Sequence, residues 1–84
     1  MPLRKYFCTV PQALIQEPII SHTLGVKFDV VPNIRAAYIN DQRALVAVDI
    51  EGDPATIDRA IEYLRERGVT VDELREGDPP PVFE

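Results

Sequence analysis

The hydrophobic pattern of residues 44–72 changes period twice, and no other feature of the sequence constrains the fold as strongly. Residues 44–51 alternate with the period of two that is typical of a β-strand. Residues 57–64 place apolar side chains at offsets of zero, three, four and seven, which is the stripe of an amphipathic helix. Residues 69–72 return to a short strand pattern. This segment therefore predicts a strand–helix–strand unit.

The ends of this predicted helix carry their own signals. Asp53 has the side chain of an N-cap, and Pro54 suits the first helical position, where a missing N–H costs nothing. Gly68 follows the last apolar residue of the stripe and is a typical helix stop. We therefore expect the helix to run between these residues.

The first half of the chain repeats the same order of elements. Residues 3–10 alternate like a strand, and Pro18 is placed to begin a helix that ends near Phe28 and loosens at Gly25. Residues 30–39 form a second extended pattern. The polar residues 40–42 between two strand patterns predict a hairpin turn.

The predicted order is strand, helix, strand, strand, helix, strand. Right-handed crossovers make this a ferredoxin-like βαββαβ sandwich of the α+β class. Its four-stranded antiparallel sheet would carry both helices on one face and leave the other face open. We expect one domain over residues 1–74, followed by a flexible proline-rich tail over residues 75–84.

The second predicted strand, residues 30–39, contains a conflict. Ile34 and Ile39 both have the character of core residues, yet positions five apart point to opposite faces of a regular strand. A β-bulge within residues 35–37 would place both on one face. The alternative is that both faces are covered, one of them by another subunit. The small Ala36 and Ala37 would let a ligand or a second backbone approach closely.

The third predicted strand suggests how a partner is bound. Val46, Val48 and Ile50 form its core face, whereas Leu45 and Ala47 make half of the outer face apolar. A solvated sheet face needs no such residues. A chain of 84 residues also buries a modest share of its surface. We therefore predict a homodimer in which two copies meet flat, sheet against sheet, through Leu45 and Ala47.

The charged and chemically active residues exclude several functions. The net charge of −5 and the absence of a basic cluster argue against nucleic-acid binding. The single Cys8 forms no internal disulfide and no metal site, and we expect no cofactor and a cytoplasmic location. No apolar run is long enough for membrane insertion. The residues form no catalytic constellation, so we expect a protein that is not an enzyme and has no catalytic residues.

Two polar residues have alternative interpretations. His22 lies off the apolar stripe, without a second ligand one helical turn away, which is typical of an exposed helix histidine. Asn33 follows Pro32 where the chain enters the second strand. Its side chain could bond nearby backbone, or it could lie at the rim of a small polar pocket on the open sheet face, where the amide can donate and accept.

The residues from Phe28 to Ile39, the hairpin after them and the segment from Ile57 to Leu74 together resemble the NIL domain. The resemblance covers roughly Arg4 to Leu74. This family, named for an Asn-Ile-Leu motif, forms the C-terminal regulatory domain of methionine-importer ABC ATPases and also occurs as single-domain proteins. It implies an ACT-like fold that pairs through its sheets and binds methionine near the dimer interface.

Carried over by position, the resemblance implies a ligand site on the second strand. Asn33 and Ile34 match the first two motif positions, and Ile39 resembles the apolar residue that lines the pocket for the ligand side chain. Arg35 departs from the family, which has Leu there; it could pair with a ligand carboxylate or block the apolar slot. With the small Ala37 beside them, these five residues are the candidate ligand site.

Two functions follow from this resemblance. The first is a stand-alone regulatory domain that binds a small amino acid or sulfur metabolite, similar to methionine, at a homodimer interface. The second is a protein-interaction module that serves sulfur amino-acid metabolism or an ABC importer by docking onto a partner in trans, without a ligand of its own.

Overall fold

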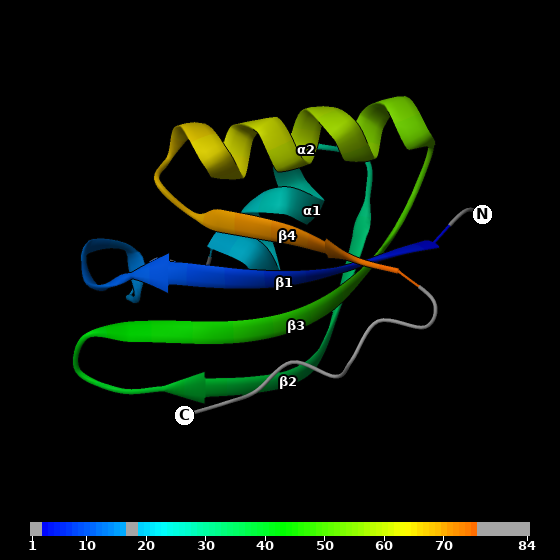
Figure 1. The fold of residues 1–84 in the computed structure, drawn as a ribbon. Coiled ribbons are helices and arrows are strands. Elements are labelled where there is room, and N and C mark those ends of the chain that lie inside the picture. The colour runs from blue at the N-terminus through cyan, green and yellow to red at the C-terminus, as the bar shows by residue number, and fades with distance from the viewer. Residues whose placement is uncertain (1–2, 17–18, 76–84) are drawn as a thin grey trace.

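The computed structural model of the chain describes residues 3–16 and 19–75. Its four strands pair antiparallel in the order β2-β3-β1-β4 (Figure 1). The strands are β1 Leu3–Pro11, β2 Val31–Ile39, β3 Arg43–Glu51 and β4 Thr70–Leu74. The helical segments are η1 Gln12–Leu14, η2 Ile19–Thr23, α1 Leu24–Lys27 and α2 Pro54–Glu66. The tail prediction falls, from residue 76 onward, outside the described residues.

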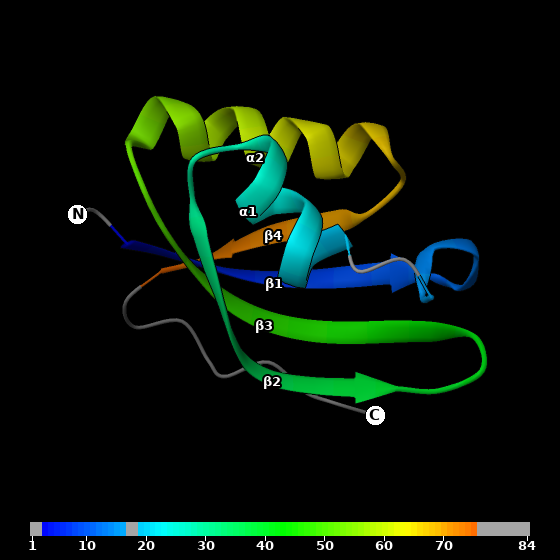
Figure 2. The ribbon, with the colours of Figure 1, turned by 180° about the vertical axis from the view of Figure 1, so that it is seen from behind.

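Both main helices lie on one face of the sheet, so the predicted α+β, ferredoxin-like arrangement is confirmed. Figure 2 shows α1 in front of β4 and β1, with α2 alongside it, whereas Figure 1 shows the sheet in front of α1. Among the described residues no helix covers the opposite face, which we call the uncovered face. Within the described chain, no helix is both long enough and apolar enough to cross a membrane.

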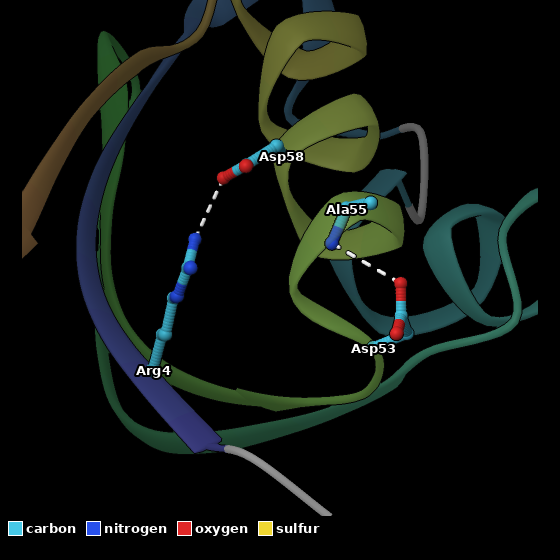
Figure 3. Close-up of polar contacts among 4 residues, drawn as sticks. All are labelled: Arg4, Asp53, Ala55 and Asp58. Carbon is cyan, nitrogen blue, oxygen red and sulfur yellow. Dashed lines mark hydrogen bonds and ion pairs between the residues drawn. The ribbon is translucent and has the colours of Figure 1, made fainter.

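The helix α2 forms as its sequence signals predict. The side chain of Asp53 accepts a hydrogen bond of 3.2 Å from the backbone N–H of Ala55 (Figure 3), and Pro54 occupies the first turn. Gly68 has a φ of 104°, a conformation that a side chain would strain. The four residues of the apolar stripe are buried against the sheet: Ile57, Ala60, Ile61 and Leu64.

The first helical segment differs from the prediction in its shape. Residues 19–23 form a wide π-helical turn, and α1 follows as a single α-helical turn. Gly25 lies within α1, so the expectation that the helix loosens at Gly25 is wrong; the wider turn precedes it. The helix ends near Phe28, as predicted, where the N–H of Phe28 donates a hydrogen bond of 3.0 Å to the carbonyl of Leu24. Ile20 and Leu24 anchor the segment in the core.

The core lies between the helices and the even-numbered side chains of β1 and β3. The sheet contributes the buried side chains of Cys8, Val48 and Ile50 to this core, and α2 contributes Leu64. Gly52 lets the chain pass close to Val30, since a Cβ at this position would lie 2.9 Å from Val30 Cγ1. This packing fixes which face of the sheet holds the core. The strand order places β2 at an edge.

Candidate functional site

The candidate ligand residues all lie on β2, which is an edge strand of the sheet. Every residue of β2 is exposed except Pro32, which is half-buried. The neighbouring strand β3 is buried over most of its length. The fold therefore presents the candidate residues as one accessible strip along the outside of the sheet.

A β-bulge at Arg35 divides this strip, which was one of the two solutions that the sequence left open. Ile34 pairs with Val48 and Ala36 pairs with Ala47, so that Arg35 has no partner of its own in the register. After the bulge, Ile39 pairs with Ala44. Because directly opposite residues share a face, Ile34 and Ile39 both lie on the helix side, with the core residues of β3.

The candidate residues are consequently divided between the two faces of the sheet. Ala37, which pairs with Val46, joins Ile34 and Ile39 on the helix side. Asn33 pairs with Asp49 and lies on the uncovered face. The structure thus brings the five residues together along one strand but not into a single pocket of one chain.

Polar groups gather on the uncovered side of the edge. The guanidinium of Arg35 donates from Nε to Oδ2 of Asp49 at 2.6 Å, and Nδ2 of Asn33 donates to Oε1 of Glu51 at 3.5 Å. The Asp49 side chain is 6% exposed, whereas that of Arg35 is 67% exposed. Lys5 pairs with Asp49 from the other side, on β1. Positively charged donors and negatively charged acceptors therefore lie within a few residues of one another on this face.

This arrangement suits a small zwitterion. A guanidinium that keeps most of its surface in solvent can bind a carboxylate, and the carboxylate of Glu51 can accept from an ammonium group. The exposed Ile34 and Ile39, on the other side of the strand, offer apolar surface. Sequence reasoning placed Asn33 and Arg35 at the site but did not identify Asp49 and Glu51, which lie on the outer face of the same predicted strand as Leu45 and Ala47.

The predicted dimer residues occupy the uncovered face. Leu45 pairs with Tyr38 and Thr9, and Ala47 pairs with Ala36 and Phe7. Leu45 is 6% exposed in the single chain, although it lies outside the core cluster. Their interface role stays a prediction, and Leu45 has little surface left to give to a partner.

A second polar group, between α2 and the strands β1 and β4, was missed by sequence reasoning. Arg4 and Asp58 form an ion pair at 2.6 Å (Figure 3) beside a hollow of about 270 Å³. Burial raises the pKa of Tyr6, and hydrogen bonds with Tyr6 and then Asp58 raise the pKa of Arg4. The sequence signal was the shared strand face of Arg4 and Tyr6. The hollow is lined by Tyr6, Asp58, Ile61, Glu62, Arg65 and Glu73.

Other described groups have ordinary surroundings. A hollow of about 460 Å³ lies between residues 12–16 and the hairpin turn at Asn40 and Asp41. His22 is exposed on η2, as predicted. Over residues 3–16 and 19–75, no group of three or more His, Cys, Asp or Glu side chains is placed to hold a metal ion.

Comparison with known proteins identifies a family. The family model of the NIL domain matches residues 8–73, which include all the strands and helices that build the sandwich, except the first residues of β1 and the last of β4. A search of curated proteins gave no match. The matched residues contain the whole of β2 and its bulge.

Proposed function

Because this chain belongs to the NIL domain family, we propose that it is a regulatory domain that binds a small amino acid or sulfur metabolite, similar to methionine. The site is centred on β2, at an interface between two copies of the chain. The observation that carries the proposal is the exposed strip of β2, where Asn33 and Arg35 lie beside apolar side chains. NIL domains are typically regulatory or ligand-binding domains, which supports the same conclusion.

The chemistry assigns a role to each group. Arg35 pairs with the ligand carboxylate through its exposed guanidinium, while Asp49 holds the arginine in place from the interior. The amide of Asn33 orients the amino and carboxylate groups, with Glu51 as the acceptor for the ammonium. Ile34, Ala37 and Ile39 of the same copy lie on the opposite face of the sheet, so the apolar end of a ligand held by Arg35 meets these side chains from the second copy at the interface.

Regulation follows from a shift between populations. A ligand that binds one arrangement of the two copies more tightly than the other increases the population of that arrangement. The shift is limited by the difference between the two affinities; about 1.4 kcal/mol of difference changes the ratio tenfold. A partner protein that recognises one arrangement then responds to the concentration of the metabolite.

Isothermal titration calorimetry tests the proposal. Methionine, cysteine and homocysteine are titrated separately into the protein, and at least one is expected to bind with millimolar or tighter affinity. Asn33→Ala and Arg35→Ala should each weaken that binding at least several-fold, whereas Arg59→Ala, on the exposed side of α2, should leave it unchanged. Absence of binding heat with all three amino acids would refute the ligand proposal.

The second candidate function is a protein-interaction module. The observation that favours it is the same edge strand, since an exposed strand edge can bind a strand of another protein through its backbone. A chain that binds none of the three amino acids but is retained by an enzyme or importer of sulfur amino-acid metabolism would support this alternative.

A further inference from the structure

Leu45 is buried on the uncovered face of the sheet, although no described helix or strand lies over it. The residue is 6% exposed in the single chain. Its partners in the register, Thr9 on β1 and Tyr38 on β2, lie beside it within the sheet. Side chains of a strand point out of the sheet, so neighbours of this kind leave the outer end of a side chain in contact with solvent. A further segment of the same chain is therefore needed to bury Leu45.

Leu45 belongs to a group of uncharged residues across the middle of this face, which we call the apolar band. Its members come from three strands and share two neighbouring rows of the register: Phe7, Ala36, Tyr38, Leu45 and Ala47. Phe7 and Ala47 are half-buried, and Tyr38 is 41% exposed. The apolar band therefore gives a covering segment a surface that is three strands wide and includes two aromatic rings.

The sequence after the described residues contains a segment of matching chemistry. Residues 76–84 read Glu-Gly-Asp-Pro-Pro-Pro-Val-Phe-Glu, so that Val82 and Phe83 follow directly on three prolines. Proline has no N–H to donate to a strand ladder, and a run of prolines favours the extended polyproline conformation. Segments of this composition bind to surfaces that present aromatic side chains. Residues 76–84 are therefore suited to lie flat on a sheet face rather than to pair with an edge.

The segment is long enough to reach the apolar band. It follows β4, whose last residue, Leu74, pairs with Lys5 and lies on the uncovered face. With strands about 4.8 Å apart and a rise of about 3.3 Å per residue, Leu45 lies on the order of 16 Å from Leu74. The residues from Leu74 to Phe83 span up to about 28 Å in the polyproline conformation. Phe83 can therefore reach Leu45 with length to spare for the turn after β4.

We propose that residues 76–84, which we call the strap, lie across the uncovered face of their own chain and pack Val82 and Phe83 on the apolar band. The ring of Phe83 covers Leu45 and contacts Phe7, since aromatic pairs are favourable. The strap occupies the face through which the sequence suggests a flat contact between two copies, and it leaves the edge of β2 accessible. The inference goes beyond the proposed function, because it requires neither a ligand nor a second copy. It replaces the flexible tail that the composition predicts.

The charges of the strap are complementary to those of the face at both of its ends. The strap carries three acidic side chains and no basic one. Arg43 lies on the same face two residues before Leu45, so that Phe83 over Leu45 brings Glu84 beside this guanidinium. Lys5 lies next to the start of the strap, because it pairs with the last residue of β4. Carboxylates near these two cations favour the acidic strap over a basic segment.

Nuclear magnetic resonance on the complete chain tests the position of the strap. In a uniformly ¹³C-labelled sample, nuclear Overhauser effects are expected between the ring protons of Phe83 and the methyl groups of Leu45 and Ala47. A mixture of labelled and unlabelled protein, filtered for contacts between copies, should show none of these effects. Absence of contact between Phe83 and the apolar band would overturn the proposal. Contacts found only between copies would also overturn it, because the strap of one copy would then cover the face of another.

A double-mutant cycle tests the energy of the contact by urea unfolding. Phe83→Ala should raise the equilibrium constant of unfolding about five- to tenfold, because the ring buries one of its faces against the sheet. Leu45→Ala should have an effect at least about twofold smaller in the Phe83→Ala background than in the wild type, since the two residues contact each other. In the matched cycle, Val26→Ala on α1, where Val26 is 71% exposed, should be additive with Phe83→Ala. Additivity in both cycles would contradict the strap.

Discussion

The guanidinium of Arg35 lies 2.6 Å from the carboxylate of Asp49 and joins the bulge of β2 to the C-terminal half of β3. The bulge gives Arg35 its position, because the extra residue is free of the β2–β3 register. The Asp49 carboxylate is nearly excluded from solvent, so its charge needs this partner. The residue that departs from the family motif is therefore tied to the framework of the sheet.

Removal of this ion pair should destabilise the fold. Arg35→Ala leaves the buried carboxylate of Asp49 without its guanidinium, and we expect a loss of about 1–3 kcal/mol in the free energy of unfolding. Urea unfolding followed by far-UV circular dichroism measures it, at one fixed protein concentration. Asp49→Asn in the same background should recover part of the loss. An equal loss in Arg59→Ala would contradict the assignment.

Two aspartates near the start of α2 should differ in their effects. Asp53→Ala removes the N-cap hydrogen bond to Ala55 and should lower the free energy of unfolding by about 1 kcal/mol. Asp58→Asn removes an ion pair with Arg4 at the surface, and we expect almost no change in the unfolding midpoint. The same urea experiment compares them, and a larger effect of Asp58→Asn would reverse our ranking.

Two glycines should respond in opposite directions to replacement by alanine. Gly68→Ala forces a side chain into a φ of 104° and should cost about 1 kcal/mol. Gly25→Ala adds a methyl group within α1, where the nearest atom is at an ordinary 3.7 Å, and should stabilise the protein by up to about 1 kcal/mol. Thermal unfolding of both variants gives the signs. Destabilisation by Gly25→Ala would show that its environment is tighter than the structure indicates.

The buried thiol of Cys8 should make stability depend on alkaline pH. Burial is the main cause that raises the pKa of Cys8 from 9.0 to about 12. Below pH 9 the thiol is protonated in both states, so its contribution is complete; between pH 9 and 12 the unfolded thiol ionises first, which favours unfolding. Between pH 7 and pH 10, the wild type should lose about 1.4 kcal/mol more than Cys8→Ala does.

Urea unfolding at these two pH values measures that difference, and the comparison cancels the titration of Tyr6, which both proteins contain. A constant difference between wild type and Cys8→Ala would mean that the thiol is not protected in the folded state.

Much of the fold could be predicted because the local signals agree with each other. The stripe of α2 is bounded by Asp53 and Gly68, and the structure places the helix between them. The conflict between Ile34 and Ile39 left two solutions, a bulge or a sheet covered on both faces, and the structure contains the bulge. The π-helical turn at residues 19–23 was not predicted, because the spacing of apolar residues is similar for neighbouring helical forms.

The sequence by itself determined the order of the elements and the ends of α2, and it limited β2 to a bulge or a second covered face, because each of these depends on residues close together in the chain. The tertiary structure alone decided that Asp49 is buried beside Arg35, that Leu45 is covered, and that the ligand candidates divide between two faces of an edge. These features depend on the strand order and on register between segments far apart in the chain. Periodicity identifies the two faces of a strand, but only the assembled sheet shows which strands lie at its edges.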